Sequence, residues 1–297
     1  MTIRLDMITA ASGAKNLLTD SAPLVAEFAS QQMNADGGFR GRSSQSDLYY
    51  TVFGLETLIA LETDFDKDSA RRYLRTFSGG QSLDLIHLAC LARCHANLSN
   101  SGDDDKMLSA RIATRIELYR TADGGYANTI NSQRGTAYGC FIALAAVQDL
   151  ALDMPDAHGI IDCLASLRRP DGSYANDAAA ETGSTPATAA ALTALHYLGY
   201  PADGAPAKWL LDRCRKTGGF LATQTAPIPD LLSTATAIHA LSITGASTDD
   251  VRQATIEFVD SLWDPQGAFS GNWLDDTLDC EYTYYALMTL GHLGKNK

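Results

Sequence analysis

The chain has 297 residues, of which 45% are hydrophobic and 20% are charged, so it carries enough apolar side chains for a sizeable core. Its formal charge of −12 and pI near 4.8 exclude the basic surface that binds nucleic acid or anionic membranes. No apolar run reaches the ~18 residues that a membrane-spanning helix needs.

The N-terminal segment from Met1 to Asp6 contains neither the basic part nor the apolar stretch of a secretion signal. The six cysteines lie mostly within apolar helical patterns, as in the segment from Leu88 to Cys94. We therefore expect reduced core thiols in a cytoplasmic protein rather than a disulfide framework.

A glycine-centred turn recurs along the chain. Its markers are Gly37, Gly79, Gly124, Gly172, Gly218 and Gly267, with spacings of 42, 45, 48, 46 and 49 residues. An aromatic residue usually follows the turn, as in Phe39, Tyr126 and Phe220. The spacing divides the chain into six units of about 46 residues.

Each unit follows the same order. A helix ends at the glycine turn, a polar loop follows, and a second helix is strongly apolar, for example over residues 50–61 and 283–293. Such helices are apolar nearly all round, which is typical of an inner layer covered by other helices. Strand-type alternation is almost absent. The pattern predicts one all-α domain over 1–297, built from six helix pairs as an open solenoid or a closed ring.

Two segments of the first unit carry a family resemblance. The segments Gln32–Arg42 and Ser46–Thr51 resemble the repeat of protein prenyltransferase β subunits, and the units around Gly172 and Gly267 are similar to those of squalene and diterpene cyclases. The resemblance covers residues 25–295. It implies an α/α toroid, with inner and outer rings of helices, and a hydrophobic isoprenoid substrate.

Aligning the starts of the second helices defines three slots on one rim of the expected ring. The first slot holds Asp47, Asp84, Ser184, Asp230 and Asp279, with the third unit near Arg134. The slot two residues later holds Tyr49, Ile86, Ala137, Pro186, Leu232 and Glu281. The third slot holds Tyr50, His87, Tyr138, Ala187, Ser233 and Tyr282, and should point the same way as the first.

The resemblance to prenyltransferases implies where a zinc site would lie. Those enzymes bind zinc through an Asp and a Cys of the fifth unit and a His of the sixth. The equivalent positions here are Asp230, Leu232 and Tyr282, of which only the first is a zinc ligand. We therefore expect the zinc site to be lost and no cofactor to be needed, although Mg²⁺ would accompany a diphosphate substrate.

The resemblance to cyclases implies a proton donor. Those enzymes place the motif Asp-x-Asp-Asp-Thr at the start of an inner helix, and this chain reads Asp-Cys-Glu-Tyr-Thr from Asp279 to Thr283. Glu281 would be the donor and Asp279 its partner, since burial and a neighbouring carboxylate both raise a carboxyl pKa. In this chain Glu281 replaces the central Asp of the motif, and Tyr282 replaces its last Asp. The segment Asp275–Thr277 is also similar to the motif but falls earlier, in an expected loop.

The remaining rim residues are candidates for substrate binding. Aromatic faces would stabilise a carbocation, and the candidates are Tyr49, Tyr50, Phe53, Tyr138, Tyr282 and Tyr285, together with His87 and Asp230. An alternative holds for Asp47, Asp84 and Asp230, because aspartate at a helix start is a common N-cap. A single histidine such as His87 is also more often structural than catalytic.

The sequence favours an acid-initiated terpene cyclase of the class II type. An alternative is an enzyme that transfers a prenyl group from a prenyl diphosphate, and a second alternative is a non-catalytic toroid that binds a prenyl chain or a protein. Because prenyltransferase β subunits work with an α subunit, the resemblance also implies a partner subunit or a homodimer.

Overall fold

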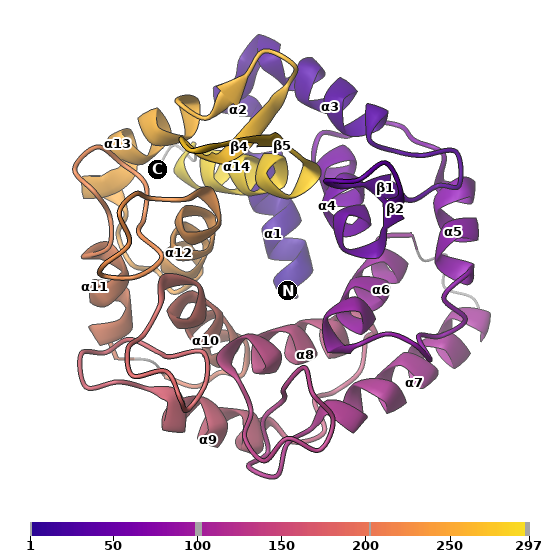
Figure 1. Cartoon of the computed structure of the whole chain (residues 1–297), viewed down its shortest axis with the longest axis vertical. Helices are drawn as coiled ribbons and strands as arrows, with labels where there is room; N and C mark the ends of the chain where they lie inside the picture. Colours follow the sequence, from indigo (N-terminus) through magenta and orange to yellow (C-terminus); the bar gives the residue numbers. More distant parts are fainter. Residues whose placement is uncertain (1, 99–102, 202, 295–297) are drawn as a thin grey trace.

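The computed structural model describes residues 2–98, 103–201 and 203–294. Their apolar helices form an inner ring of α4 (Leu48–Ala60), α6 (Leu85–Leu98), α8 (Ala137–Asp149), α10 (Thr185–Tyr197), α12 (Leu231–Ile243) and α14 (Cys280–Leu293). The outer ring contains α3 (Ala22–Gln31), α5 (Lys67–Arg75), α7 (Asp103–Ile116), α9 (Ala157–Leu167), α11 (Ala205–Leu211) and α13 (Asp249–Asp260). Each inner helix packs against the next, and α14 packs against α4 (Figure 1). The α/α toroid prediction is confirmed, and the ring is closed.

The turns between outer and inner helices depend on glycine. All six marker glycines have φ between 84° and 94°, a conformation that other residues rarely adopt. At Gly218 an added Cβ would also lie 1.8 Å from the carbonyl oxygen of Ala254 in the next outer helix. The turn therefore needs glycine both for its conformation and for close packing.

A threonine in the inner helix ties the turn to the helix start. The backbone N–H of the aromatic residue after the turn donates to a threonine hydroxyl. The pairs are Phe39–Thr51 at 3.0 Å, Tyr174–Thr188 at 3.0 Å, Phe220–Thr234 at 2.9 Å and Phe269–Thr283 at 3.4 Å. Three of these hydroxyls, on Thr51, Thr234 and Thr283, donate to the carbonyl of the residue four earlier. The bonds fix the height of these four inner helices relative to their turns.

The last unit departs from the helical pattern. The strands β3 (Trp263–Asp264), β4 (Ala268–Asn272) and β5 (Asp275–Leu278) form an antiparallel sheet, and β1 (Phe39–Arg40) pairs with β2 (Ser46–Asp47) in the first unit. Asp275–Thr277, expected in a loop, therefore lies on a strand. The side chain of Asn272 accepts the N–H of Leu274 at 2.9 Å and closes a tight turn, which lets β4 and β5 pair.

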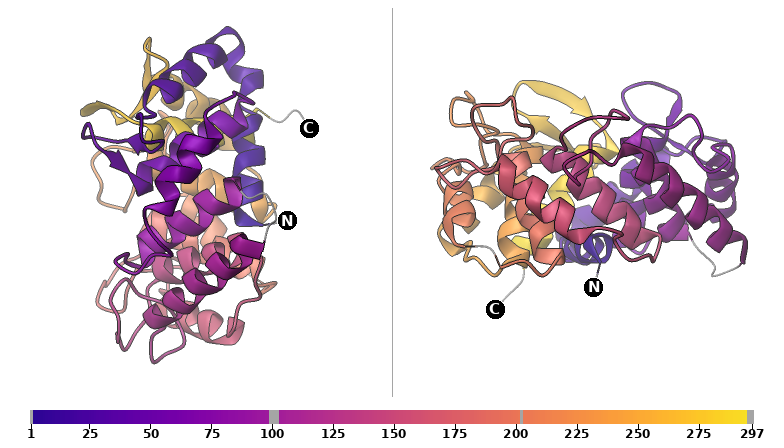
Figure 2. Two further views of the ribbon diagram at one scale, coloured as in Figure 1. Left: turned by 90° about the vertical axis from the view of Figure 1, so that its right-hand side faces the viewer. Right: turned by 90° about the horizontal axis from the view of Figure 1, so that it is seen from below.

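The segment before the first unit forms a helix that the repeat did not predict. Helix α1 (Ile3–Ser12) crosses the central opening of the ring in Figure 1. Figure 2 places it on the face opposite the β4–β5 hairpin. It packs against α4, α8 and α14, and it is followed by α2 (Lys15–Leu18) and the 3₁₀ turn η1 (Thr19–Ser21). A second 3₁₀ turn, η2 (Glu117–Tyr119), follows α7. Helix α1 therefore closes one end of the ring.

The six cysteines are free thiols, and only Cys214 is not fully buried, in agreement with the expected core thiols. The Sγ atoms of Cys140 and Cys163 lie 3.8 Å apart, between α8 and α9. Over the described ranges, no helix combines the length and the apolar character needed to cross a bilayer.

Candidate active site

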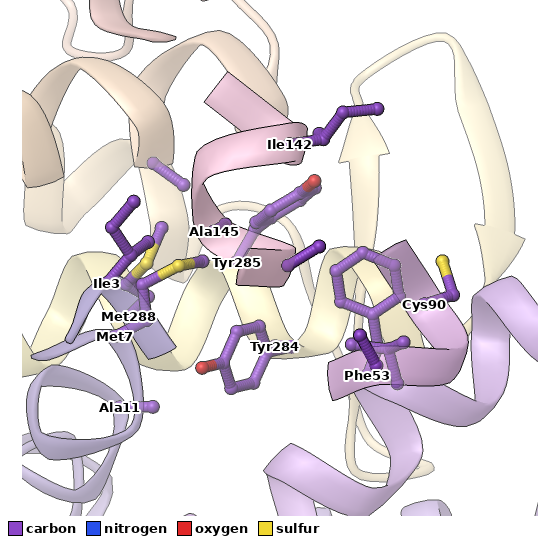
Figure 3. Close-up of a cluster of buried hydrophobic side chains, with 14 of the residues drawn as sticks. Ile3, Met7, Ala11, Phe53, Cys90, Ile142, Ala145, Tyr284, Tyr285 and Met288 are labelled. Atoms are coloured by element: carbon purple, nitrogen blue, oxygen red, sulfur yellow. The ribbon is translucent and has the colours of Figure 1, made fainter. Parts of the chain in front are cut away.

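The inner helices surround a cavity of about 460 Å³. All six contribute to its lining, and Met7 of α1 lies at the closed end near Met288 of α14 (Figure 3). Most lining side chains are apolar or aromatic, such as Phe53, Ile142 and Leu232. The volume and the lining are typical of a site for a small hydrophobic molecule.

The mouth of the cavity lies where the inner helices begin. Each helix starts at a capping side chain that accepts a backbone N–H, namely Asp47, Asp84, Thr136, Ser184, Asp230 and Asp279. The start of the third inner helix was expected near Arg134, and this was wrong. The cap is Thr136, whose hydroxyl accepts the N–H of Gly139 at 2.9 Å. Tyr138 therefore belongs to the second slot, not the third.

The second slot faces the cavity. Its members are Tyr49, Ile86, Tyr138, Pro186, Leu232 and Glu281, and all except Glu281 are part of the cavity lining. Tyr138 is 40% exposed, so this end is open to solvent. Glu281 stands at the equivalent position of the sixth helix. Its Oε1 accepts a hydrogen bond of 2.6 Å from the hydroxyl of Tyr49, which does line the cavity. Glu281 is therefore the one carboxyl in the second slot, and it lies beside the mouth.

The surroundings of Glu281 favour its neutral form. Burial raises the pKa of this carboxyl, and the nearby Asp279 carboxylate raises it further. The hydrogen bond from Tyr49 and the charge of Arg42 act in the opposite direction. Burial is the largest of these effects, so the pKa of Glu281 lies above its ordinary value. A carboxyl group of this kind retains its proton to higher pH and can act as a general acid.

Asp279 has a structural role beside Glu281. Its Oδ1 accepts the N–H of Tyr282 at 2.9 Å and caps α14. Its Oδ2 is buried without a hydrogen bond and lies 3.5 Å from Nε of Arg42, close enough for charge attraction but not aligned for a bond. Burial raises the pKa of Asp279, and the cap and Arg42 oppose that rise. Asp279 thus holds the start of the helix that carries Glu281.

Aromatic rings continue from the mouth into the cavity. Tyr49 makes an edge contact with Phe53, with centroids 5.1 Å apart, and Phe53 makes another with Tyr285 at 5.5 Å. These three rings and Tyr138 all line the cavity, and Figure 3 shows Phe53 and Tyr285 among the buried cluster. The π faces of such rings attract cations.

Four other candidate residues lie outside the cavity lining. Tyr282 packs beneath Arg42, whose Nη2 donates to its hydroxyl at 3.4 Å, and Tyr50 packs against Gly41 in the same loop. His87 Nδ1 lies 2.7 Å from Asp84, the cap of α6. Asp230 caps α12 and accepts bonds from the N–H and hydroxyl of Ser233. Their role in substrate binding stays a prediction.

The positions equivalent to a prenyltransferase zinc site do not form a set of ligands. Asp230 uses both oxygens on Ser233, Leu232 offers no donor atom, and the Tyr282 hydroxyl accepts from Arg42. Within the described part of the chain, no three His, Cys, Asp or Glu side chains are grouped closely enough to hold a metal ion. These residues therefore do not fit zinc, and the need for a cofactor stays untested.

The sequence did not reveal a charged network at the opposite end of the cavity. Arg93 and Asp149 line the cavity near α1, and Arg4 of α1 reaches the same carboxylate. Glu56 is fully buried beside them. The only signal in the sequence was an isolated Asp, Glu, Lys or Arg in each of three apolar helices, at Glu56, Arg93 and Asp149.

The sequence matches the family described as the prenyltransferase alpha-alpha toroid domain over residues 5–84, 82–204 and 190–297. A search of curated proteins finds no match.

Solved structures share the fold at low sequence identity. The type II terpene cyclase MstE from Scytonema, in complex with geranylgeranyl dihydroxybenzoate as substrate, has a TM-score of 0.67 and 14% identity, with 95% of this chain and 97% of that chain covered. A protein from Actinoplanes has a TM-score of 0.64 and 14% identity, with 92% and 98% covered. Candida albicans protein geranylgeranyltransferase-I, complexed with GGPP, has a TM-score of 0.64 and 15% identity, with 94% and 90% covered.

Proposed function

Because this chain belongs to the prenyltransferase alpha-alpha toroid family, we propose that it is an acid-initiated isoprenoid cyclase of the class II type. The observation that carries the proposal is Glu281, a carboxyl of raised pKa held by Tyr49 at the mouth of an aromatic cavity. A chain of similar length and fold, the Scytonema enzyme, is a type II terpene cyclase, so one ring is a sufficient size for this activity.

The reaction follows from the placement of these groups. Neutral Glu281 gives its proton to a terminal alkene or epoxide of the substrate, which leaves a carbocation on the substrate and a carboxylate on the enzyme. The next double bonds attack the cation in turn and close rings. The faces of Tyr49, Phe53 and Tyr285 stabilise the positive charge as it moves along the chain. Loss of a proton ends the sequence, so an alkene substrate gives an isomeric product.

The test is turnover of a panel of polyprenyl substrates by purified protein, followed by mass spectrometry. We expect an isomeric product, and a loss of at least about 100-fold in kcat for Glu281→Gln, because a general acid contributes roughly 10²–10⁴-fold. The matched control is Glu257→Gln on outer helix α13, where the exposed carboxylate only accepts from Gln253. Full turnover by Glu281→Gln would show that the acid is another group.

The same panel separates the other two functions. A cyclase of this kind needs no metal and should work in the presence of a chelator. Turnover that requires an added thiol acceptor and stops with chelator supports prenyl transfer. Tight binding of the substrates without turnover supports a binding toroid.

A further inference from the structure

The closed end of the cavity carries charge. Arg93 lies seven residues after Ile86 on α6, so it is about 10 Å deeper than the mouth. Asp149 of α8 lies beside it, and both are part of the lining. Between these two levels the wall is mostly apolar, with Ala89, Cys90 and Ile142 among its members. The polar groups of the cavity are thus concentrated toward opposite ends.

Two arginines share one carboxylate at this floor. The carboxylate of Asp149 is shared, since it accepts from Nε of Arg4 at 3.1 Å and from Nε of Arg93 at 3.0 Å. Glu56 lies 3.7 Å from Arg93, but its Oε2 is buried without a hydrogen bond. Burial raises the pKa of Glu56 and favours its neutral form. Arg93 therefore shares its main ionic partner with Arg4.

The guanidinium of Arg93 has hydrogen-bond donors that no strong acceptor uses. Its Nη1 contacts only the sulfur of Met7, at 3.7 Å, which is a weak acceptor. Among residues 2–98, 103–201 and 203–294, no oxygen accepts a hydrogen bond from Nη2. The side chain keeps 13% of its surface accessible, in a residue that lines the cavity. A guanidinium with one terminal nitrogen on a weak sulfur acceptor and the other without an oxygen acceptor is suited to a planar anion that accepts two parallel hydrogen bonds.

We propose that Arg93 binds a carboxylate head group of the isoprenoid substrate. The chain then runs from the floor to the mouth, and its far double bond reaches Glu281. A single guanidinium whose charge is partly shared with Asp149 matches one negative charge better than a diphosphate. The proposal rests on the proposed function for its substrate class, but the carboxylate site itself is tested by binding alone.

The experiment compares two ligands with the same hydrocarbon chain, farnesoic acid and farnesol, by isothermal titration calorimetry at neutral pH. The wild-type protein should bind the acid at least about tenfold more tightly than the alcohol, as expected for a charged hydrogen-bonded pair. In Arg93→Met this preference should disappear. Comparing the acid-to-alcohol affinity ratio of the wild type with that of the variant forms a double-mutant cycle. A general structural disturbance weakens the binding of both ligands and therefore cancels in the comparison.

A second variant covers the case in which Arg93→Met does not fold, because it leaves Asp149 with one partner fewer. Arg93→Gln keeps an N–H donor for Asp149 and leaves the bond between Arg4 and Asp149 in place, and it should also lose the preference for the acid. Equal binding of acid and alcohol by the wild type would overturn the proposal, as would a preference that survives either variant.

The cyclase proposal and the carboxylate-site proposal can fail separately, and the results distinguish them. Acid-specific binding without turnover of any substrate would overturn the cyclase and leave the carboxylate site standing. Turnover of neutral substrates with no acid preference would do the reverse. If neither ligand binds, the cavity does not accept isoprenoids and both proposals fail.

Discussion

The hydrogen bond between Tyr49 and Glu281 predicts how the pH dependence of turnover responds to the loss of one hydroxyl. The proposed general acid, Glu281, is active when protonated, so kcat should be full below its pKa and fall as the pH rises through it. The phenol of Tyr49 donates to Oε1 at 2.6 Å and stabilises the charged form, which lowers the pKa from the value that burial alone would give. Tyr49→Phe removes that stabilisation, so the alkaline limb of the kcat profile should move to higher pH.

The size of the shift follows from the geometry. A hydrogen bond to a charged group contributes about 1.5–3 kcal/mol, and one pKa unit corresponds to about 1.4 kcal/mol. Because Glu281 is only partly buried, water replaces some of the lost stabilisation. We therefore expect a shift of about one unit, at the lower end of that range.

The assay is the pH profile of kcat under saturating substrate, for the wild type, Tyr49→Phe and Tyr138→Phe. Tyr138 is the matched control, since it occupies the equivalent slot of α8 but makes no hydrogen bond to Glu281 in the described structure. Its variant should keep the alkaline limb within a few tenths of a unit, whatever happens to the rate. An unmoved limb in Tyr49→Phe, or a shift to lower pH, would refute the assignment of the limb to Glu281.

Two further predictions concern the frame that holds the site. Gly291→Ala should lower the free energy of unfolding by about 1–3 kcal/mol, because the new Cβ would lie 1.6 Å from the carbonyl oxygen of Ala10 and push α1 from the ring. Chemical denaturation measures the loss, and an unchanged midpoint would contradict the close contact. Thr234→Val should cost about 1–3 kcal/mol, because it leaves the buried N–H of Phe220 without its acceptor at 2.9 Å. Thr236→Ser, on the same helix, is the control, and equal stability of both variants would refute the role of this bond.

The repeat made the fold predictable because its signal is local. A positive φ at six evenly spaced positions requires glycine, and the glycine pattern alone located every turn between an outer and an inner helix. The inner helices were recognisable by their apolar character. The start of the third helix was misplaced because the alignment followed acidic caps, whereas a threonine hydroxyl at Thr136 satisfies the same backbone N–H groups.

The sequence allowed better prediction of the mouth of the site than of its floor. Glu281 follows a cap at Asp279 in a short motif, so its place at the start of an inner helix needed only the repeat. The floor depends on contacts between distant segments, such as Arg4 with Asp149, which are 145 residues apart. The sequence before the first repeat carried no motif to suggest that α1 crosses the ring. The residues around an isolated arginine also do not indicate which distant carboxylate it will bind.

The capping aspartates surround the mouth of the site. Six helix N-termini converge around the mouth, and each carries a partial positive charge that would favour the carboxylate form of Glu281. Four of the six caps are aspartates, at positions 47, 84, 230 and 279, and the last of these raises the pKa of Glu281. Burial has the largest effect on the pKa of Glu281, so this pKa is raised. Capping and catalysis are therefore not alternatives for Asp279, because this cap also helps to keep the proposed acid protonated.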